Sequence, residues 1–219
     1  KDKLALYLGE CRRMGITVLV PDVNDSDSDF SAVGEQVRFG LSAVRNVGAN
    51  VVEGILGARR EKGAFTSFQD FLDKVPLQVC NKRAIECLVK AGAFDSMGYS
   101  RKALLAKVEE AVDAVVSLKK NEAAGQFDLF GGADVDLGAG IDVVVPDIPE
   151  WDKKVKLDHE RDMLGLYVSD HPLSGMEHVL DRAADTTIVR LMNEESVQEG
   201  FVSLAGLITS VQPRVSKKN

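Results

Sequence analysis

Residues 41–55 read Leu-Ser-Ala-Val-Arg-Asn-Val-Gly-Ala-Asn-Val-Val-Glu-Gly-Ile, and this stretch decides the fold that we expect. It fits a template of two helices joined by a Gly-apolar-Gly turn, with Asn46 at the first glycine position and Gly48 at the second. Asparagine is among the few non-glycine residues that tolerate a left-handed backbone. We therefore predict a tight turn that directs backbone N–H groups to the start of the second helix, where an anion can bind.

The pattern is that of a helix-hairpin-helix motif, and a weaker second copy spans residues 85–94, where the turn has only Gly92. Paired hairpins of this kind hold the DNA backbone, so their contacts carry no sequence code and weaken with salt. In the alternative interpretation the two glycines are ordinary helix caps or turns, and the nearby basic residues only face solvent. The residues predicted to contact DNA are Arg45, Asn46, Val47, Gly48, Ala49, Lys90, Gly92, Arg101 and Lys102.

Apolar spacing outside the hairpins predicts a mainly α protein. Residues 4–14 and 151–168 have helical periodicity, and a long helix is expected after a Ser100 N-cap, with a core stripe of Leu104, Val108, Ala111, Val115 and Leu118. A short strand is expected at 16–20, a polar loop at 22–29 and helices throughout 36–116. Residues 201–211 predict a strand; because a lone strand cannot satisfy its backbone, we expect a fragment cut inside a β domain.

The net charge of −7 hides an uneven distribution. Residues 121–150 carry seven acidic residues and no Lys or Arg, whereas residues 38–107 carry 12 basic residues against 6 acidic ones. A locally basic module inside an acidic protein can still attract phosphates.

Several classes of protein are disfavoured by composition. There is no apolar run of membrane-spanning length and no signal peptide behind Lys1, so a cytoplasmic protein without a membrane partner is expected. The three cysteines form no CxxC pair, and the histidines have no cysteine at metal-ligand spacing. We expect no metal site, no cofactor and no catalytic residue in this stretch of sequence.

Residues 126–130, Gln-Phe-Asp-Leu-Phe, lie in the acidic, glycine-rich segment after the long predicted helix. They resemble the sliding-clamp-binding peptide of bacteria, which has Gln, two variable residues and Leu-Phe. Gln126 would form directional hydrogen bonds, and Leu129 and Phe130 would enter an apolar pocket. Asp128, at a variable position before these two anchors, is also predicted to bind the clamp. Burial of each anchor is worth about 1.5–3 kcal/mol before ordering costs, so the peptide alone should bind weakly and gain from tethering.

Six stretches occur in order along the chain: residues 10–16, 21–24, 44–48, 91–95, 125–130 and 164–173. Taken together, they resemble the C-family of bacterial replicative polymerases, the DNA polymerase III alpha subunits. The resemblance implies the end of the fingers at 1–35, a helix-hairpin-helix bundle at 36–120, a clamp-binding linker at 121–150, a helical connector at 151–199 and the start of an OB fold at 200–219. It also implies polymerase aspartates and Mg²⁺ upstream of Lys1, with duplex DNA, the sliding clamp (beta subunit) and other replicase subunits as partners. Two alternatives stay open: a stand-alone helix-hairpin-helix DNA-binding or repair module, and a protein-interaction scaffold.

Overall fold

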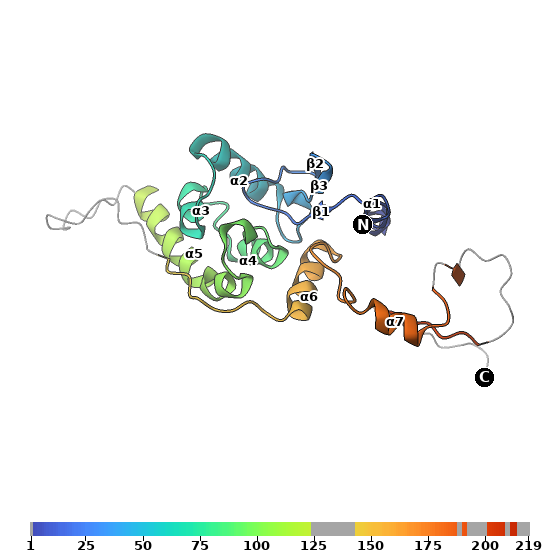
Figure 1. The fold of residues 1–219 in the computed structure, drawn as a ribbon. Coiled ribbons are helices and arrows are strands. Elements are labelled where there is room, and N and C mark those ends of the chain that lie inside the picture. Colours follow the sequence, from blue (N-terminus) through green and yellow to red (C-terminus); the bar gives the residue numbers. More distant parts are fainter. Residues whose placement is uncertain (1, 124–142, 188–189, 192–200, 209–210, 214–219) are drawn as a thin grey trace. The chain divides into compact units, whose positions relative to one another are not determined.

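Two helices, α4 (Lys82–Ala91) and α5 (Arg101–Ala123), pack against each other at the centre of the fold (Figure 1). The Asn81 side chain caps the start of α4, and Gly92 ends it in a left-handed conformation. Ser100 caps α5 as predicted, because its Oγ accepts a hydrogen bond of 3.0 Å from the N–H of Ala103. The structure, a computed structural model, describes residues 2–123, 143–187, 190–191, 201–208 and 211–213.

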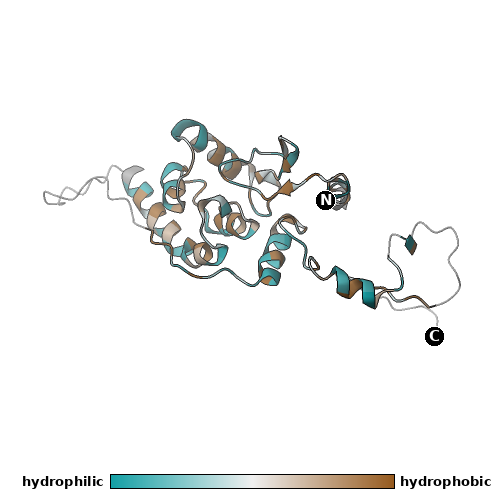
Figure 2. Cartoon of the chain, viewed as in Figure 1, coloured by the Kyte–Doolittle hydropathy of each residue, from teal (hydrophilic) through white to brown (hydrophobic). Residues whose placement is uncertain are grey.

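The chain divides into two compact units, residues 1–170 and 171–219, and each is described by itself. In the first unit, α2 (Ala49–Lys62), α3 (Phe68–Lys74) and α6 (Lys153–Leu164) complete the bundle around α4 and α5. The predicted stripe on α5 is buried except for Leu118. Figure 2 shows α6 as largely hydrophilic with a hydrophobic band, in keeping with the burial of Leu157 and Leu164.

Four phenylalanines form the centre of the core beside α3. Phe71 meets Phe65 and Phe94 edge to face, with ring centroids 5.1 and 4.9 Å apart, and Phe68 meets Phe94 in the same way at 5.4 Å. Such edge-to-face pairs add about 0.5–1.5 kcal/mol each beyond the burial of apolar area. The cluster therefore fixes α3 against the turn that follows α4.

A small sheet precedes the bundle, and most of it was not expected. After helix α1 (Asp2–Arg13), strand β1 (Val18–Leu19) pairs in parallel with β3 (Gln36–Arg38), which also pairs with β2 (Ser31–Val33) in the antiparallel sense. The expectation of helix from residue 36 onward is thus corrected at 36–38. The loop between β1 and β2 is held by Arg59, whose guanidinium donates to the carbonyls of Val23 and Ser26 at 3.1 and 2.9 Å.

Residues 143–150 form a strap that lies on the bundle without helix or strand structure. The N–H of Val143 donates to Gln69 of α3 at 3.2 Å, and Ser100 donates to the carbonyl of Ile148 at 2.6 Å. Val143 and Val145 pack against the core. The last eight residues of the predicted linker are therefore a docked part of the first unit.

In the second unit, helix α7 spans Glu177–Ala183, and Asp185 and Ser203 exchange two hydrogen bonds, Asp185 N–H to the Ser203 carbonyl at 3.0 Å and Ser203 N–H to the Asp185 carboxylate at 2.9 Å. Residues 201–208 and 211–213 have no strand structure, which corrects the predicted strand there. Phe201 and Ile208 are exposed. Across the described part of the chain, every helix is too short or too polar to cross a bilayer.

Candidate nucleic-acid interface

The first hairpin consists of a single 3-10 turn, η1 (Leu41–Ala43), the turn residues 44–48 and helix α2. Asn46 has a φ of 62° and is the one non-glycine residue with positive φ in the described ranges, as the template predicted. Val44 and Val47 on either side of it are buried, at 3% and 7% exposure. The turn thus inserts its apolar residues into the core and leaves Arg45, Asn46 and Gly48 at the surface.

The start of α2 is open to solvent. Gly48 is the N-cap residue and has no side chain to satisfy the first amides, and the first turn contains no acidic residue. The Gly48 carbonyl accepts from Val51 and Val52, whereas the N–H groups of Ala49 and Asn50 have no acceptor among the residues that the structure describes. Exposed, unpaired amides at the positive end of a helix form an anion site.

Two contacts hold the hairpin turn in place. The N–H of Arg45 donates to the carbonyl of Met163 at the end of α6, at 3.0 Å, and the Asn46 amide lies 3.4 Å from the Cys87 sulfur in α4. The Arg45 side chain is exposed and forms no ion pair with any described residue. A cleft of about 780 Å³ runs beside the turn, lined by residues 42–46, residues 163–166 and Leu4.

The second hairpin has a different arrangement, because the start of α5 is already occupied. The Glu150 carboxylate at the end of the strap accepts from the N–H groups of Arg101 and Lys102 at 3.0 and 3.3 Å. Partial burial tends to raise the pKa of Glu150, but these bonds, with one from the N–H of Trp151, outweigh it and hold the pKa below its ordinary value. A carboxylate of the chain itself thus caps α5, whereas no described side chain caps α2.

Arg101, which we predicted to contact DNA, lies inside the protein at 1% exposure. Its guanidinium donates two short bonds to Asp95, at 2.9 and 2.7 Å, and lies 3.4 Å from the fully buried Glu160. Burial alone would lower the pKa of Arg101, but the two carboxylates raise it. The group has no access to a phosphate, so the expectation for Arg101 is corrected.

Gly92 is also a packing residue. It is buried with a φ of 89°, and a Cβ built on it would lie 2.2 Å from the Arg101 guanidinium. Its neighbours in the predicted set differ: Lys102 is exposed, and Lys90 is half-buried and gives its carbonyl to Arg101 at 3.2 Å. The structure therefore brings together Arg45, Asn46, Gly48 and Ala49 at one exposed turn, with Val47 beneath them.

Glu160 and Glu150 organise the second hairpin, and sequence reasoning missed both. Glu160 accepts from the N–H groups of Val168 and Ser169 at 2.6 and 2.8 Å as well as facing Arg101. Both carboxylates accept hydrogen bonds from residues 48 or more positions away, and Glu160 also accepts from a loop with no periodic pattern. The sequence around each glutamate therefore gives no sign of these contacts. The sequence shows that both residues are acidic, but it does not show which groups they contact.

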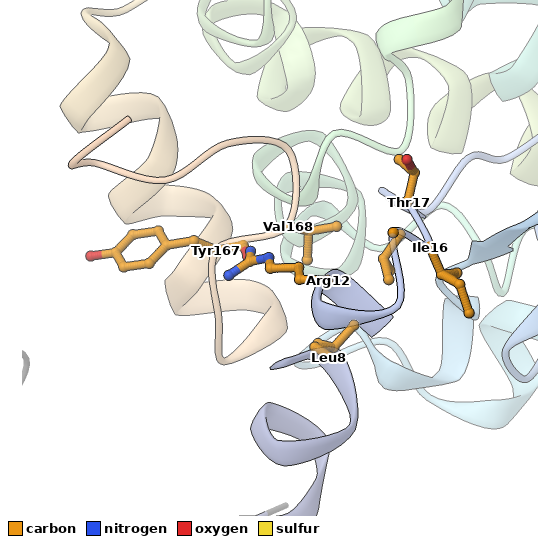
Figure 3. Close-up of a pocket in the computed structure, with 8 residues that line it drawn as sticks. Leu8, Arg12, Ile16, Thr17, Tyr167 and Val168 are labelled. Atoms are coloured by element: carbon orange, nitrogen blue, oxygen red, sulfur yellow. The ribbon is translucent and has the colours of Figure 1, made fainter. Parts of the chain in front are cut away.

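A smaller pocket of the first unit lies beside α1. Figure 3 shows a pocket of about 300 Å³ between α1, β1 and residues 167–168, with the Tyr167 ring pointing away from it. Arg12, the one charged side chain that lines it, donates to the Tyr167 carbonyl at 2.6 Å. Among the described residues, no three His, Cys, Asp or Glu side chains are grouped as metal ligands.

The predicted clamp-binding residues Gln126, Asp128, Leu129 and Phe130 lie outside the described residues. The described structure ends before them with α5, at Ala123, and resumes after them with the strap at Val143.

Comparison with known proteins gives a consistent result. A family model for the helix-hairpin-helix motif matches residues 15–104. The chain is 53% identical to the DNA polymerase III subunit alpha of Saccharopolyspora erythraea over 99% of its length, 50% identical to that of Mycobacterium tuberculosis over 99%, and 34% identical to that of Pseudomonas aeruginosa over 99%. It spans about a fifth of each relative, 18–20%. The resemblance inferred from the motifs is confirmed.

Proposed function

We propose, on the premise that this chain fits a region of the DNA polymerase III alpha subunit, that it holds duplex DNA through the phosphate backbone while the polymerase replicates it. The observation that carries the proposal is the open start of α2, where exposed amides follow a left-handed Asn46. A phosphate oxygen is the anion that best fits such a site in a DNA-bound protein.

The surroundings of the turn support this proposal. The Arg45 side chain projects from the same turn and forms no ion pair with any described residue. The contacts to Met163 and Cys87 hold the backbone in place before any ligand arrives. A preorganised site loses little entropy on binding. Because amides and a guanidinium read phosphates and not bases, the affinity should vary little among unrelated sequences and should fall as salt is raised.

Substitution of Gly48 tests the proposal directly. Its φ of −82° suits any residue, and a Cβ there meets no atom within 4 Å, so both Gly48→Asp and Gly48→Asn should fold. Each side chain can cap α2, but only aspartate adds a negative charge beside the amides. We expect Gly48→Asp to weaken duplex binding about tenfold or more in fluorescence anisotropy, and Gly48→Asn to weaken it clearly less.

Equal affinities of Gly48→Asp and the unchanged protein at low salt would overturn the proposal, since a charge in the site would then be without effect. A second duplex of unrelated sequence serves as the control for specificity: both duplexes should give the same ratio between variants.

We further propose that residues 126–130 dock the polymerase on its sliding clamp. The support is the peptide itself, with Gln126, Leu129 and Phe130 at the spacing of the clamp-binding pattern. The test is a titration of purified bacterial clamp into Leu129→Ala/Phe130→Ala, with Phe127→Ala as the matched control because it removes an aromatic ring at a variable position. Loss of binding only in the double variant is expected; equal binding by all three proteins would reject the peptide.

The activity of the whole protein is proposed from the relatives. They are DNA polymerase III alpha subunits, so we infer a DNA-directed DNA polymerase acting in the cytoplasm with other replicase subunits, whose Mg²⁺-binding aspartates lie outside this region. The similarity over the full chain favours this view over a stand-alone repair module or a scaffold. We expect no nucleotidyl transfer by residues 1–219 alone in a primer-extension assay; extension would contradict the assignment.

A further inference from the structure

The basic residues of the first unit fall into two groups according to whether a carboxylate neutralises them. Lys82, at the start of α4, pairs with Glu109 and Asp113 of α5, at 3.2 and 2.8 Å. The next residue, Arg83, is exposed and forms no ion pair or hydrogen bond with any described residue. A guanidinium without an internal partner keeps its full charge for an external anion.

Arg83 belongs to the solvent-facing stripe of α4. The helix buries Ala84, Ile85, Cys87, Leu88, Val89 and Ala91, which leaves Arg83, Glu86 and Lys90 on its outer face at helical spacing. We call these three residues the α4 stripe. None of its three side chains forms an ion pair within the described structure, so Glu86 does not neutralise either cation.

The α4 stripe lies next to the first hairpin. The Asn46 amide is 3.4 Å from the sulfur of Cys87, which is one helical turn from Arg83 and adjacent in sequence to Glu86. A duplex whose phosphate occupies the start of α2 therefore passes beside α4. In the N-terminal half of α4, the cation that forms no ion pair with any described residue is Arg83.

We infer that Arg83 is a second phosphate contact, which extends the anion site at the start of α2 onto α4. This inference rests on the proposed function of the first hairpin. Arg83 and Lys90 are seven residues apart, a rise of about 10 Å along the helix, which equals the axial rise of about three nucleotides of one DNA strand. The stripe thus has the length to follow a strand beyond the single phosphate held by α2.

The test compares Arg83→Ala with Arg60→Ala in the full chain. Arg60 is equally exposed and unpaired among the described residues, but it lies at the other end of α2, about 17 Å along the helix from Ala49. Both variants lose one positive charge, so a general effect of net charge is the same in each. With a 20-base-pair duplex in fluorescence anisotropy, we expect Arg83→Ala to lose three- to tenfold in affinity and Arg60→Ala less than twofold.

Salt dependence adds a second readout. Loss of one phosphate contact should reduce the slope of log affinity against log salt by about 0.9, and only Arg83→Ala should show it. Arg83→Lys retains the charge and should restore most of the affinity. Equal effects of Arg83→Ala and Arg60→Ala would overturn the inference while leaving the hairpin proposal intact if Gly48→Asp still weakens binding. If Gly48→Asp has no effect either, both proposals fail together.

Discussion

Helices α2 and α5 both begin at the turn of a predicted hairpin, yet their first turns are satisfied in opposite ways. At α5, the Ser100 hydroxyl and the Glu150 carboxylate accept from Arg101, Lys102 and Ala103. At α2, Gly48 supplies no side chain, and the amides of Ala49 and Asn50 face solvent. The start of α5 is thus capped from within the chain, whereas no described side chain caps the start of α2.

The difference extends to the cations around each start. At the start of α5, the Arg101 guanidinium forms ion pairs with Asp95 and Glu160. Beside α2, Arg45 and Arg83 form no ion pair within the described structure. Because a buried cation paired with two carboxylates has no charge left for a ligand, the second hairpin stabilises the fold, and the proposed DNA contact lies at the first hairpin. A hairpin motif in a sequence therefore predicts a turn. Whether a carboxylate of the chain already occupies the helix start after that turn decides whether the turn can bind a phosphate.

The largest effect that this comparison predicts is on Arg101. Arg101→Ala should lower the free energy of unfolding by about 3–5 kcal/mol, because it leaves the fully buried Glu160 without its cation. Urea unfolding followed by circular dichroism measures the change. The control is Lys82→Ala, whose exposed pairs with Glu109 and Asp113 contribute about 0–1 kcal/mol. If Arg101→Ala loses no more unfolding free energy than the control, the ion pairs of Arg101 with Asp95 and Glu160 do not stabilise the fold at the start of α5.

The two hairpin glycines should differ next. Gly92→Ala places a methyl group at a φ of 89° and against the Arg101 guanidinium, so we expect a loss of about 2–3 kcal/mol in unfolding free energy. Gly48→Ala, at a φ of −82° with open space around it, should cost about 1 kcal/mol or less, mainly through weaker capping. Thermal or urea unfolding of both variants gives the ranking, and equal losses would remove the distinction between packed and open glycine.

The carboxylate at the α5 start predicts a pH dependence. The pKa of Glu150 is lowered in the folded chain, so its contribution is full above the carboxyl's ordinary value of 4.5 and is lost as the pH falls through the folded value below it. At pH 7, Glu150→Gln should cost about 1 kcal/mol of unfolding free energy, since it removes a charged cap. The gap between the two proteins should shrink as the pH is lowered from 5 toward 3 in urea titrations; a constant gap would mean that the charge is not what stabilises the strap.

Much of the first hairpin, together with the cap and the core stripe of α5, could be predicted from the sequence, because their determinants are local. The template placed Asn46 in a left-handed conformation, and the spacing of apolar residues placed Leu104, Val108, Ala111 and Val115 in the core. Both are consequences of steric limits and helical periodicity within a few residues. The Ser100 cap was found for the same reason.

The contacts that Glu150 and Glu160 make at the second hairpin could not be predicted in this way, because the residues in contact are distant in sequence. Arg101 has the same local signature as a surface arginine, and only the return of Glu160 from 59 positions away makes it a buried residue. The strap depends likewise on Glu150, and β1 pairs with β3 across an intervening loop. The strand predicted at 201–208 and 211–213 was wrong for a different reason: the apolar residues were present, but a strand needs a partner to satisfy its backbone.

The smallest predicted effect concerns Glu86, the carboxylate of the α4 stripe. Glu86 lies between Arg83 and Lys90 and forms no ion pair with either, so it opposes a bound phosphate without supporting the fold. Glu86→Gln should therefore raise duplex affinity about twofold and leave the unfolding free energy within about 0.5 kcal/mol. The matched control is Glu53→Gln, an exposed carboxylate on α2, beyond its first turn. If only Glu86→Gln gains affinity, and does so in low salt but not in high salt, the DNA-binding surface includes the α4 stripe. If both variants gain equally, the effect comes from net charge, and the DNA-binding surface does not extend from the α2 turn onto α4.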